Sequence, residues 1–193
     1  MNINNKTQTI VGLGLLTAIV VVLQALSLSI PVGIFRITLV LVPIIVGAAL
    51  YGVFAGAWLG FVFGVVVLFT DAGAFLAVNI PGTIITVMLK GTMAGIVAGL
   101  VYKALAKKNK LIAVLLAGVA APVTNTGLFL VGCALFFMDT INEWAIALGY
   151  PSAGNYMIFG MVGINFFVEL VINLALSTAI VQIIGIAKKS NVA

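Results

Sequence analysis

Long apolar runs, separated by short polar or charged segments, account for nearly all of the chain. Runs of about 20 apolar residues match the hydrocarbon core of a bilayer, which is about 30 Å thick. The first run covers residues 9–29, and Pro31 and Gly33 favour a break after it. Between Arg36 and Lys90 there is enough apolar sequence to cross a bilayer twice if the turn is tight. The whole pattern predicts six membrane-spanning helices, at residues 9–29, 37–51, 55–70, 82–103, 111–137 and 156–187.

The composition favours a membrane protein over a soluble one. Of the 193 residues, 64% are hydrophobic and 7% are charged, and the mean hydropathy is +1.35. A soluble domain carries roughly a quarter charged residues. No polar stretch is long enough for a separate soluble domain. Residues 1–193 are therefore expected to form a single all-α membrane domain, an integral bundle of six transmembrane helices in the plasma membrane.

The positions of the charged residues predict the orientation of this bundle. Seven of the nine basic residues fall on one side of the predicted bundle, which holds the N-terminus, the loop between the fourth and fifth spans, and the C-terminus. They are Lys6, Lys103, Lys107, Lys108, Lys110, Lys188 and Lys189. Lysine and arginine concentrate on the cytoplasmic side of membrane proteins, so this side and both termini are expected to be cytoplasmic. The opposite side carries Asp71, Asp139, Glu143 and one cation, Arg36. The first span is expected to be a retained helix, because no signal-peptide cleavage site follows it.

The residue types that the sequence lacks exclude several kinds of chemistry. There is no histidine, and the single cysteine, Cys133, lies in an apolar run. Metal sites built on imidazole, Ser-His triads and disulfide frameworks are therefore excluded, and a membrane enzyme is disfavoured. No Gly-rich Walker sequence is present, so no ATPase activity and no cofactor are expected in this chain. The net charge of +5 flanks the spans instead of clustering on a soluble face, which argues against nucleic acid as a partner.

Small residues recur at every fourth position on three of the predicted helices. The three sets are Gly14 and Ala18, then Gly56, Gly60 and Gly64, then Gly91, Gly95 and Gly99. In lipid, such stripes allow two helices to approach closely. Most stripes are expected to pack inside the bundle, whereas a stripe that faces outward would be a docking surface for another membrane protein.

Lys90 lies near the middle of the fourth predicted span, where a lysine costs about 2.5 to 3.5 kcal/mol to insert. It is therefore expected to face the bundle interior, towards a partner or a wet cavity. The only acid within a span is Glu169, which shares one helix face with Asn165 and Asn173. The fifth span contributes Asn125. These side chains predict a polar substrate pocket that opens outward between the fourth, fifth and sixth spans.

Other interpretations of these residues remain open. Lys90 and Glu169 could form a buried structural ion pair, and the asparagines could join helices by hydrogen bonds, which is the role expected for Asn173. Arg36 could extend to lipid headgroups or meet an anion at the mouth of the pocket. The candidate substrate-binding residues, which include one asparagine in the loop before the fourth span and one tyrosine at the start of the sixth, are Arg36, Asn79, Lys90, Asn125, Tyr156, Asn165 and Glu169.

The length, the six apolar spans, the small pair in "GLGLLTA" and the polar residues of the last three spans resemble the substrate-binding (S) component of energy-coupling factor (ECF) vitamin transporters. The resemblance implies a protein that captures a water-soluble vitamin outside the cell. It also implies partners, namely a transmembrane coupling protein and two cytoplasmic ATPases that use ATP. The docking surface would lie on the first three helices and include Gly14 and Ala18. The family often has alanine at both positions, and glycine here preserves the small size.

Three segments resemble the pantothenate-specific members more narrowly: "ITLVLVPIIVGAALYGVFAGAWLGFVFGVVVL", "MLKGTMAGIVAGLVYK" and "APVTNTGLFLVG". Pantothenate carries one carboxylate, one amide and two hydroxyls. Lys90 or Arg36 would bind the carboxylate, while Asn125, Asn165 and Glu169 would pair with the amide and hydroxyls. Folate, riboflavin or a pyrimidine precursor is the alternative substrate within the family. A self-sufficient carrier or channel that uses Glu169 and Lys90 is the alternative outside it.

Overall fold

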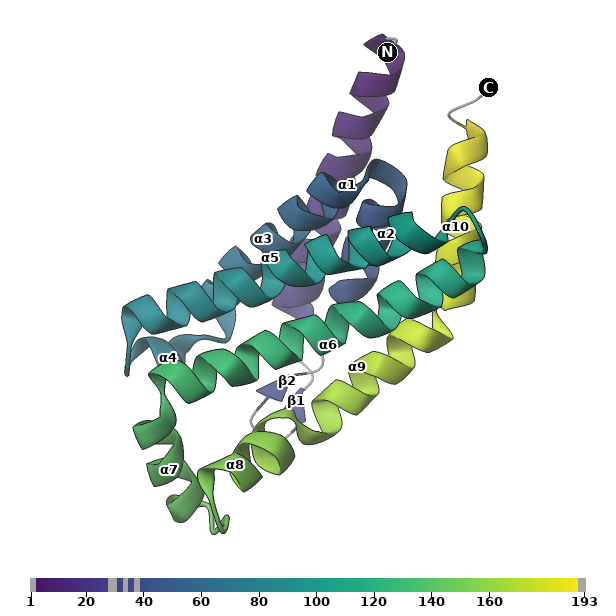
Figure 1. Cartoon of the computed structure of the whole chain (residues 1–193). Coiled ribbons are helices and arrows are strands. Elements are labelled where there is room, and N and C mark those ends of the chain that lie inside the picture. Colours follow the sequence, from purple (N-terminus) through teal and green to yellow (C-terminus); the bar gives the residue numbers. More distant parts are fainter. Residues whose placement is uncertain (1–2, 28–30, 33–34, 37–38, 191–193) are drawn as a thin grey trace.

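The computed structural model describes residues 3–27, 31–32, 35–36 and 39–190, which form a bundle of helices with one small antiparallel hairpin (Figure 1). The longer helices are α1 (Ile3–Ser27), α3 (Val53–Thr70), α5 (Ile80–Leu105), α6 (Lys110–Phe136), α9 (Gly163–Ala175) and α10 (Ser177–Ser190). The shorter elements are α2 (Leu41–Tyr51), α4 (Gly73–Leu76), α7 (Met138–Ala147), α8 (Ala153–Asn155), the π-helix η1 (Tyr156–Val162) and the strands β1 (Pro31–Val32) and β2 (Phe35–Arg36).

Short polar signals set the ends of the central helices. The side chain of Asn79 caps α5 by accepting a hydrogen bond from the backbone N–H of Gly82 at 2.9 Å. Asn109 caps α6 in the same way, accepting from Ile112 at 3.1 Å. Such caps satisfy backbone donors that the first turn of a helix leaves unpaired. Gly52 separates α2 from α3 with a φ of 95°, a conformation that residues with a Cβ rarely adopt.

Within the described part of the chain, five helical segments are long and apolar enough to cross a membrane, which confirms an all-helical, multi-pass membrane protein. They correspond to five of the six predicted spans. The remaining one, predicted at 37–51, contains α2, whose 11 residues extend over about 16 Å, roughly half of a bilayer core. Most of α2 is buried among the other helices. The number of crossings and the cytoplasmic location of the termini stay predictions.

The last predicted span, 156–187, differs from a single straight helix. It is divided into η1, α9 and α10, and the chain turns sharply between α9 and α10 (Figure 1). Near this turn, the Asn173 side chain donates to the carbonyl of Glu169 at 2.9 Å, and the Ser177 hydroxyl donates to the carbonyl of Asn173 at 2.8 Å. Side chains that bond to carbonyls four residues back compete with the backbone ladder and bend helices. The pattern of apolar residues alone does not show these side-chain hydrogen bonds, so it predicted one continuous helix.

Helix α5 lies at the centre of the bundle and packs most extensively against α3 and α6. The contact with α3 is backbone to backbone, because a Cβ added at Gly60 would overlap the carbonyl oxygen of Gly91. A Cβ added at Gly95 would likewise overlap the carbonyl oxygen of Gly56. These two glycine stripes therefore pack inside the bundle, as the sequence predicted for most of them.

The two chain ends lie on the same side of the bundle. In Figure 1, α1 begins and α10 ends at the top of the molecule, and the turn that joins α5 to α6 lies on the right, beside α10. The hairpin and the short helices α4, α7 and α8 lie towards the opposite, lower left side. This separation matches the division between the lysine-rich segments and the acidic loops in the sequence.

Candidate substrate cavity

A cavity of about 570 Å³ is lined by the parts of the long helices that lie away from the chain ends. Its walls come from the end of α1, the second half of α3, the first half of α5, the second half of α6, and from α4, α7, η1 and α9. This volume is within the range of about 300 to 1,000 Å³ that is typical of small-molecule sites. The polar lining residues are Gln24, Thr70, Asp71, Thr83, Thr86, Lys90, Asn125, Thr126, Tyr156, Asn165 and Glu169.

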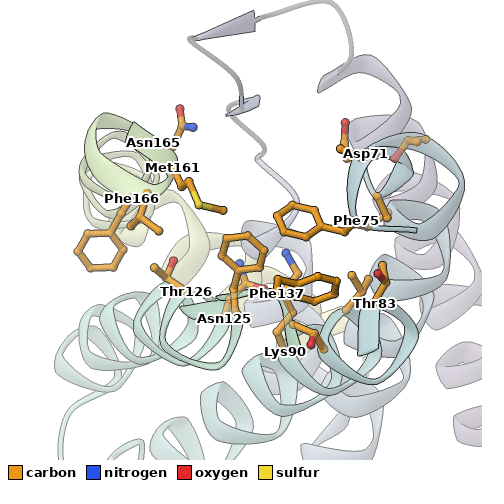
Figure 2. Close-up of a pocket in the computed structure, with 18 of the residues that line it drawn as sticks. Asp71, Phe75, Thr83, Lys90, Asn125, Thr126, Phe137, Met161, Asn165 and Phe166 are labelled. Carbon is orange, nitrogen blue, oxygen red and sulfur yellow. Dashed lines mark hydrogen bonds between the residues drawn. The ribbon is translucent and has the colours of Figure 1, made fainter. Parts of the chain in front are cut away.

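Lys90 enters the cavity from α5 and is surrounded by aromatic rings (Figure 2). Its Nζ lies 5.0 Å from the ring centroid of Phe129 on α6 and 5.9 Å from that of Phe63 on α3. Glu169 attracts the Lys90 charge more strongly than any other acid does. Within the described part of the chain, however, Lys90 and Glu169 do not form an ion pair with a nitrogen to oxygen distance of 4.0 Å or less. The faces of these rings therefore stabilise the Lys90 ammonium group, a role for which the sequence had suggested the carboxylate of Glu169 as one possibility.

Two asparagines that line the cavity carry a buried amide oxygen without a hydrogen-bond partner among the described residues. These atoms are Oδ1 of Asn125 on α6 and Oδ1 of Asn165 on α9, and the hydroxyl oxygen of Thr86 on α5 shares the same state. Buried polar atoms are nearly always paired in folded proteins, so each orphan calls for an explanation. A bound ligand that donates N–H or O–H groups would satisfy the asparagine oxygens.

Phe75, on the short helix α4, connects three other aromatic residues at one wall of the cavity. Its ring meets Phe137, Trp144 and Phe129 edge to face, at centroid distances of 5.0, 5.6 and 5.7 Å. All four line the cavity. Edge-to-face pairs contribute about 0.5 to 1.5 kcal/mol each beyond the burial of their surface. The loop after α3 is thereby held against α6 and α7 and closes one side of the site.

A polar link joins α1 to the end of α3 at another part of the wall. Gln24, which is 2% exposed, donates from Nε2 to the carboxylate of Asp71 and to the hydroxyl of Thr70 at 3.3 Å. Thr70 in turn donates to the carbonyl of Val66 at 3.0 Å. Asp71 itself is exposed, and both Gln24 and Asp71 line the cavity. The apolar second half of α1 thus places one amide at the cavity.

The seven residues that the sequence predicted to bind substrate do not all lie at the cavity. Five of them meet at the cavity, namely Lys90, Asn125, Tyr156, Asn165 and Glu169. The side chain of Asn79 instead caps α5, where it accepts a hydrogen bond from the backbone of Gly82. The backbone of Arg36 lies in β2, whereas its side chain is outside the described residues, and its contact with an anion stays a prediction.

The aromatic residues around Phe75 and the link between Gln24 and Asp71 were not predicted from the sequence, although the spacing of some other cavity residues could have been noticed. Thr83 and Thr86 precede Lys90 by seven and four residues, so they share its helix face. Phe129 follows Asn125 by four residues for the same reason. Phe75 and Trp144 lie in segments between the predicted spans, and no periodicity in those segments marks them as cavity residues. Gln24 was a single amide within a predicted span, without a neighbour to suggest a partner.

The small pair on α1 faces outward. Gly14 and Ala18 are both exposed, and a Cβ added at Gly14 would meet no atom within 4 Å. Around them lie exposed apolar side chains, including Val11, Leu15 and Val22. Helix α1 is the least buried of the five candidate spans. The α1 pair therefore differs from the inward-facing glycines of α3 and α5.

A multi-pass helical bundle with a largely apolar cavity of small-molecule size, lined by a few polar groups, defines a solute-binding membrane protein. The family described as "ECF transporter, substrate-specific component" matches residues 8–183, and this chain belongs to it. The protein is thus a subunit of a plasma-membrane transporter and not an enzyme. Membership implies a vitamin as substrate, and partner subunits of the ECF module that hydrolyse ATP.

The chain is similar to a curated relative, the pantothenic acid transporter PanT of Lactococcus lactis subsp. cremoris. The two sequences are 27% identical over 205 aligned positions, which cover 97% of this chain and 98% of the relative. No solved structure matches the chain significantly.

Proposed function

We propose that this substrate-specific component binds pantothenate in the cavity between α5, α6 and α9. The observation that carries the proposal is Lys90, a cation that reaches a cavity of small-molecule size and is held by aromatic rings. Pantothenate has a single carboxylate, which a lysine can bind by a charge-assisted hydrogen bond. The relative that is named as a pantothenic acid transporter supports the same substrate.

The remaining polar groups of the cavity complement the rest of the ligand. Pantothenate donates one amide N–H and two hydroxyls, and the Oδ1 atoms of Asn125 and Asn165 need donors. Glu169 adds a carboxylate that accepts from a hydroxyl. The geminal methyl groups of the ligand would pack against the aromatic side chains near Phe75.

We further propose that the cavity opens to the outside of the cell and that transport depends on docking to a separate module. The lysine-rich segments lie on the side of the chain ends, away from the cavity, which supports an outward opening. The partners would be a transmembrane coupling protein and two cytoplasmic ATPases. The exposed stripe of Gly14 and Ala18 supports α1 as part of the docking surface.

Binding of radiolabelled pantothenate to the purified chain tests the substrate. We expect saturable binding that unlabelled pantothenate displaces, whereas folate, riboflavin and pyrimidine precursors do not. Native mass spectrometry of the freshly purified protein would identify a co-purified vitamin by its mass. A different vitamin in that spectrum, or displacement by one of the competitors alone, would reject pantothenate and leave the family assignment unchanged.

The alternative of a self-sufficient carrier is tested in liposomes. The purified chain alone should bind pantothenate without accumulating it, and accumulation should require the coupling protein, the ATPases and ATP. Uptake by the chain alone would favour a carrier in which Glu169 or Lys90 exchanges protons.

A further inference from the structure

The link between Gln24 and Asp71 places a carboxylate at the wall of the cavity. Gln24 is almost fully buried, yet its amide donates to Asp71 and Thr70 and lines the cavity. Asp71 remains exposed and lines the same cavity. A buried amide that donates to a carboxylate fixes the direction of that carboxylate, because the amide itself is held in a packed helix.

We propose that Asp71 recognises the terminal hydroxyl of the ligand and that Gln24 is the positioning residue that aims it. The inference rests on the proposed function, in which the carboxylate at one end of the ligand binds Lys90. It adds a binding partner, Asp71, for the hydroxyl at the other end. A carboxylate accepts hydrogen bonds and donates none when ionised, so it selects hydroxyl and amide donors. It also repels a second carboxylate, so the ligand enters with its neutral end towards Asp71.

The dimensions of the cavity agree with this orientation. In Figure 2, Lys90 lies low in the view, and Asp71 lies at the opposite side, beyond Thr83. Lys90 and Thr83 are seven residues apart on α5, which corresponds to about 10 Å along the helix. From its carboxyl carbon to its terminal oxygen, extended pantothenate has eight bonds, and at about 1.2 Å of advance per bond they also reach about 10 Å. The ligand is therefore about as long as the stretch of α5 between Thr83 and Lys90, both of which line the cavity together with Asp71.

The test uses two probes, pantothenate and the analogue in which hydrogen replaces the terminal hydroxyl. The wild-type protein should bind pantothenate about 10 to 100 times more tightly than the analogue, since a hydrogen bond to a charged group is lost. Asp71→Asn should lower this ratio several-fold, because a neutral amide oxygen accepts a weaker hydrogen bond than a carboxylate does. Gln24→Met, which keeps the length and the burial of the side chain, should lower the ratio although the Asp71 carboxylate is still present.

Two further variants separate positioning from a structural role. In the Asp71→Asn background, Gln24→Met should change the ratio no further, because the amide acts through the carboxylate. The control Asp139→Asn removes an exposed acid of α7, outside the residues that line the cavity, and should leave the ratio at the wild-type value. Thermal unfolding of each variant reports folding independently of the ratio.

The outcomes are distinguishable. A wild-type protein that binds pantothenate and the analogue equally well would refute the hydroxyl site and leave pantothenate as the substrate. An unchanged ratio in Asp71→Asn would refute it as well. A ratio that persists in Gln24→Met would refute the positioning role of Gln24. A wild-type protein that binds no pantothenate would reject the proposed function and this inference together.

Discussion

The ammonium group of Lys90 lies over the ring of Phe129, with 5.0 Å between Nζ and the ring centroid. Phe129 reaches this position from α6, and Phe63 approaches the same nitrogen from α3. Aromatic faces stabilise a desolvated cation without neutralising it. The N–H donors of Lys90 can therefore bind an anionic ligand. In a tight ion pair with a glutamate, these donors would be occupied by the carboxylate.

Lys90→Met tests the binding of the carboxylate. The change keeps the length and apolar bulk of the side chain and removes its charge. Pantothenate affinity should fall by about 2 to 5 kcal/mol, as for the loss of a buried charged partner, while the protein stays folded. Isothermal titration of the purified protein measures the loss. Lys103→Met, at the exposed end of the same helix, should bind as the wild type does.

Glu169→Gln, alone and combined with Lys90→Met, tests the alternative of a structural ion pair. If the charges stabilise each other in the fold, Lys90→Met should lower the melting temperature and Glu169→Gln should restore much of it in the double variant. We expect little such rescue, because the two groups do not form a close ion pair in the described structure. Full rescue, together with unchanged ligand affinity, would assign Lys90 a purely structural role.

Phe75→Leu tests the aromatic wall. The variant loses three edge-to-face contacts and should be less stable by about 1 to 3 kcal/mol. It should also bind pantothenate more weakly, because Phe75 lines the cavity. Phe69→Leu is the matched control, since Phe69 lies near the end of α3 and is 85% exposed. Melting curves in detergent would contradict the interpretation if both variants lost the same stability.

Gly95→Ala tests the close contact between α3 and α5. An added methyl group would overlap the carbonyl of Gly56, and the forced separation should cost about 1 to 3 kcal/mol. The control is Gly127→Ala on α6, where an added Cβ meets no atom within 4 Å. This control should be neutral or slightly stabilising, because alanine favours a helix more than glycine does. Equal melting temperatures of the two variants would rule out the tight contact.

Gly14→Leu tests the docking surface on α1. The position is open in the isolated chain, so the variant should bind pantothenate with wild-type affinity. A bulky side chain would instead prevent another helix from approaching, and pantothenate uptake by the complete transporter should be lost. Ala18→Leu should behave in the same way, because Ala18 is exposed one turn further along the helix. Loss of binding by the isolated chain would show that the pair packs within the bundle.

The orientation of the chain is open to a direct measurement in intact cells. Lys108→Cys, in the turn between α5 and α6, should resist a membrane-impermeant thiol reagent, since this turn is expected to be cytoplasmic. Glu143→Cys, exposed on α7, should react from outside. The native Cys133 is buried and contributes little background. Labelling of position 108 from outside would reverse the proposed orientation.

Some properties of this protein are determined by its sequence alone, for a simple physical reason. Water is absent from the bilayer core, so backbone groups must pair within helices and charged side chains are expensive there. Apolar runs therefore predicted the membrane fold and five of its candidate spans, and the cost of Lys90 predicted that it faces the interior of the bundle, where it lines a cavity. Helix periodicity predicted that Asn165 and Glu169 share one face, and the cost of polar groups in lipid predicted that Lys90 and Asn125 face the interior with them; all four line the cavity.

Only the tertiary structure decided how these helices meet. Sequence spacing shows which side chains share a face, but it does not show which faces oppose each other across the bundle. Thus the rings of Phe63 and Phe129, far apart in the chain, approach Lys90, a contact that no spacing in the sequence indicated. In the same way, only folding brings Gln24 of α1 to Asp71 after α3, turns the glycines of α3 towards those of α5, and leaves Gly14 exposed. These contacts depend on packing between distant segments, for which local hydrophobic patterns carry no information.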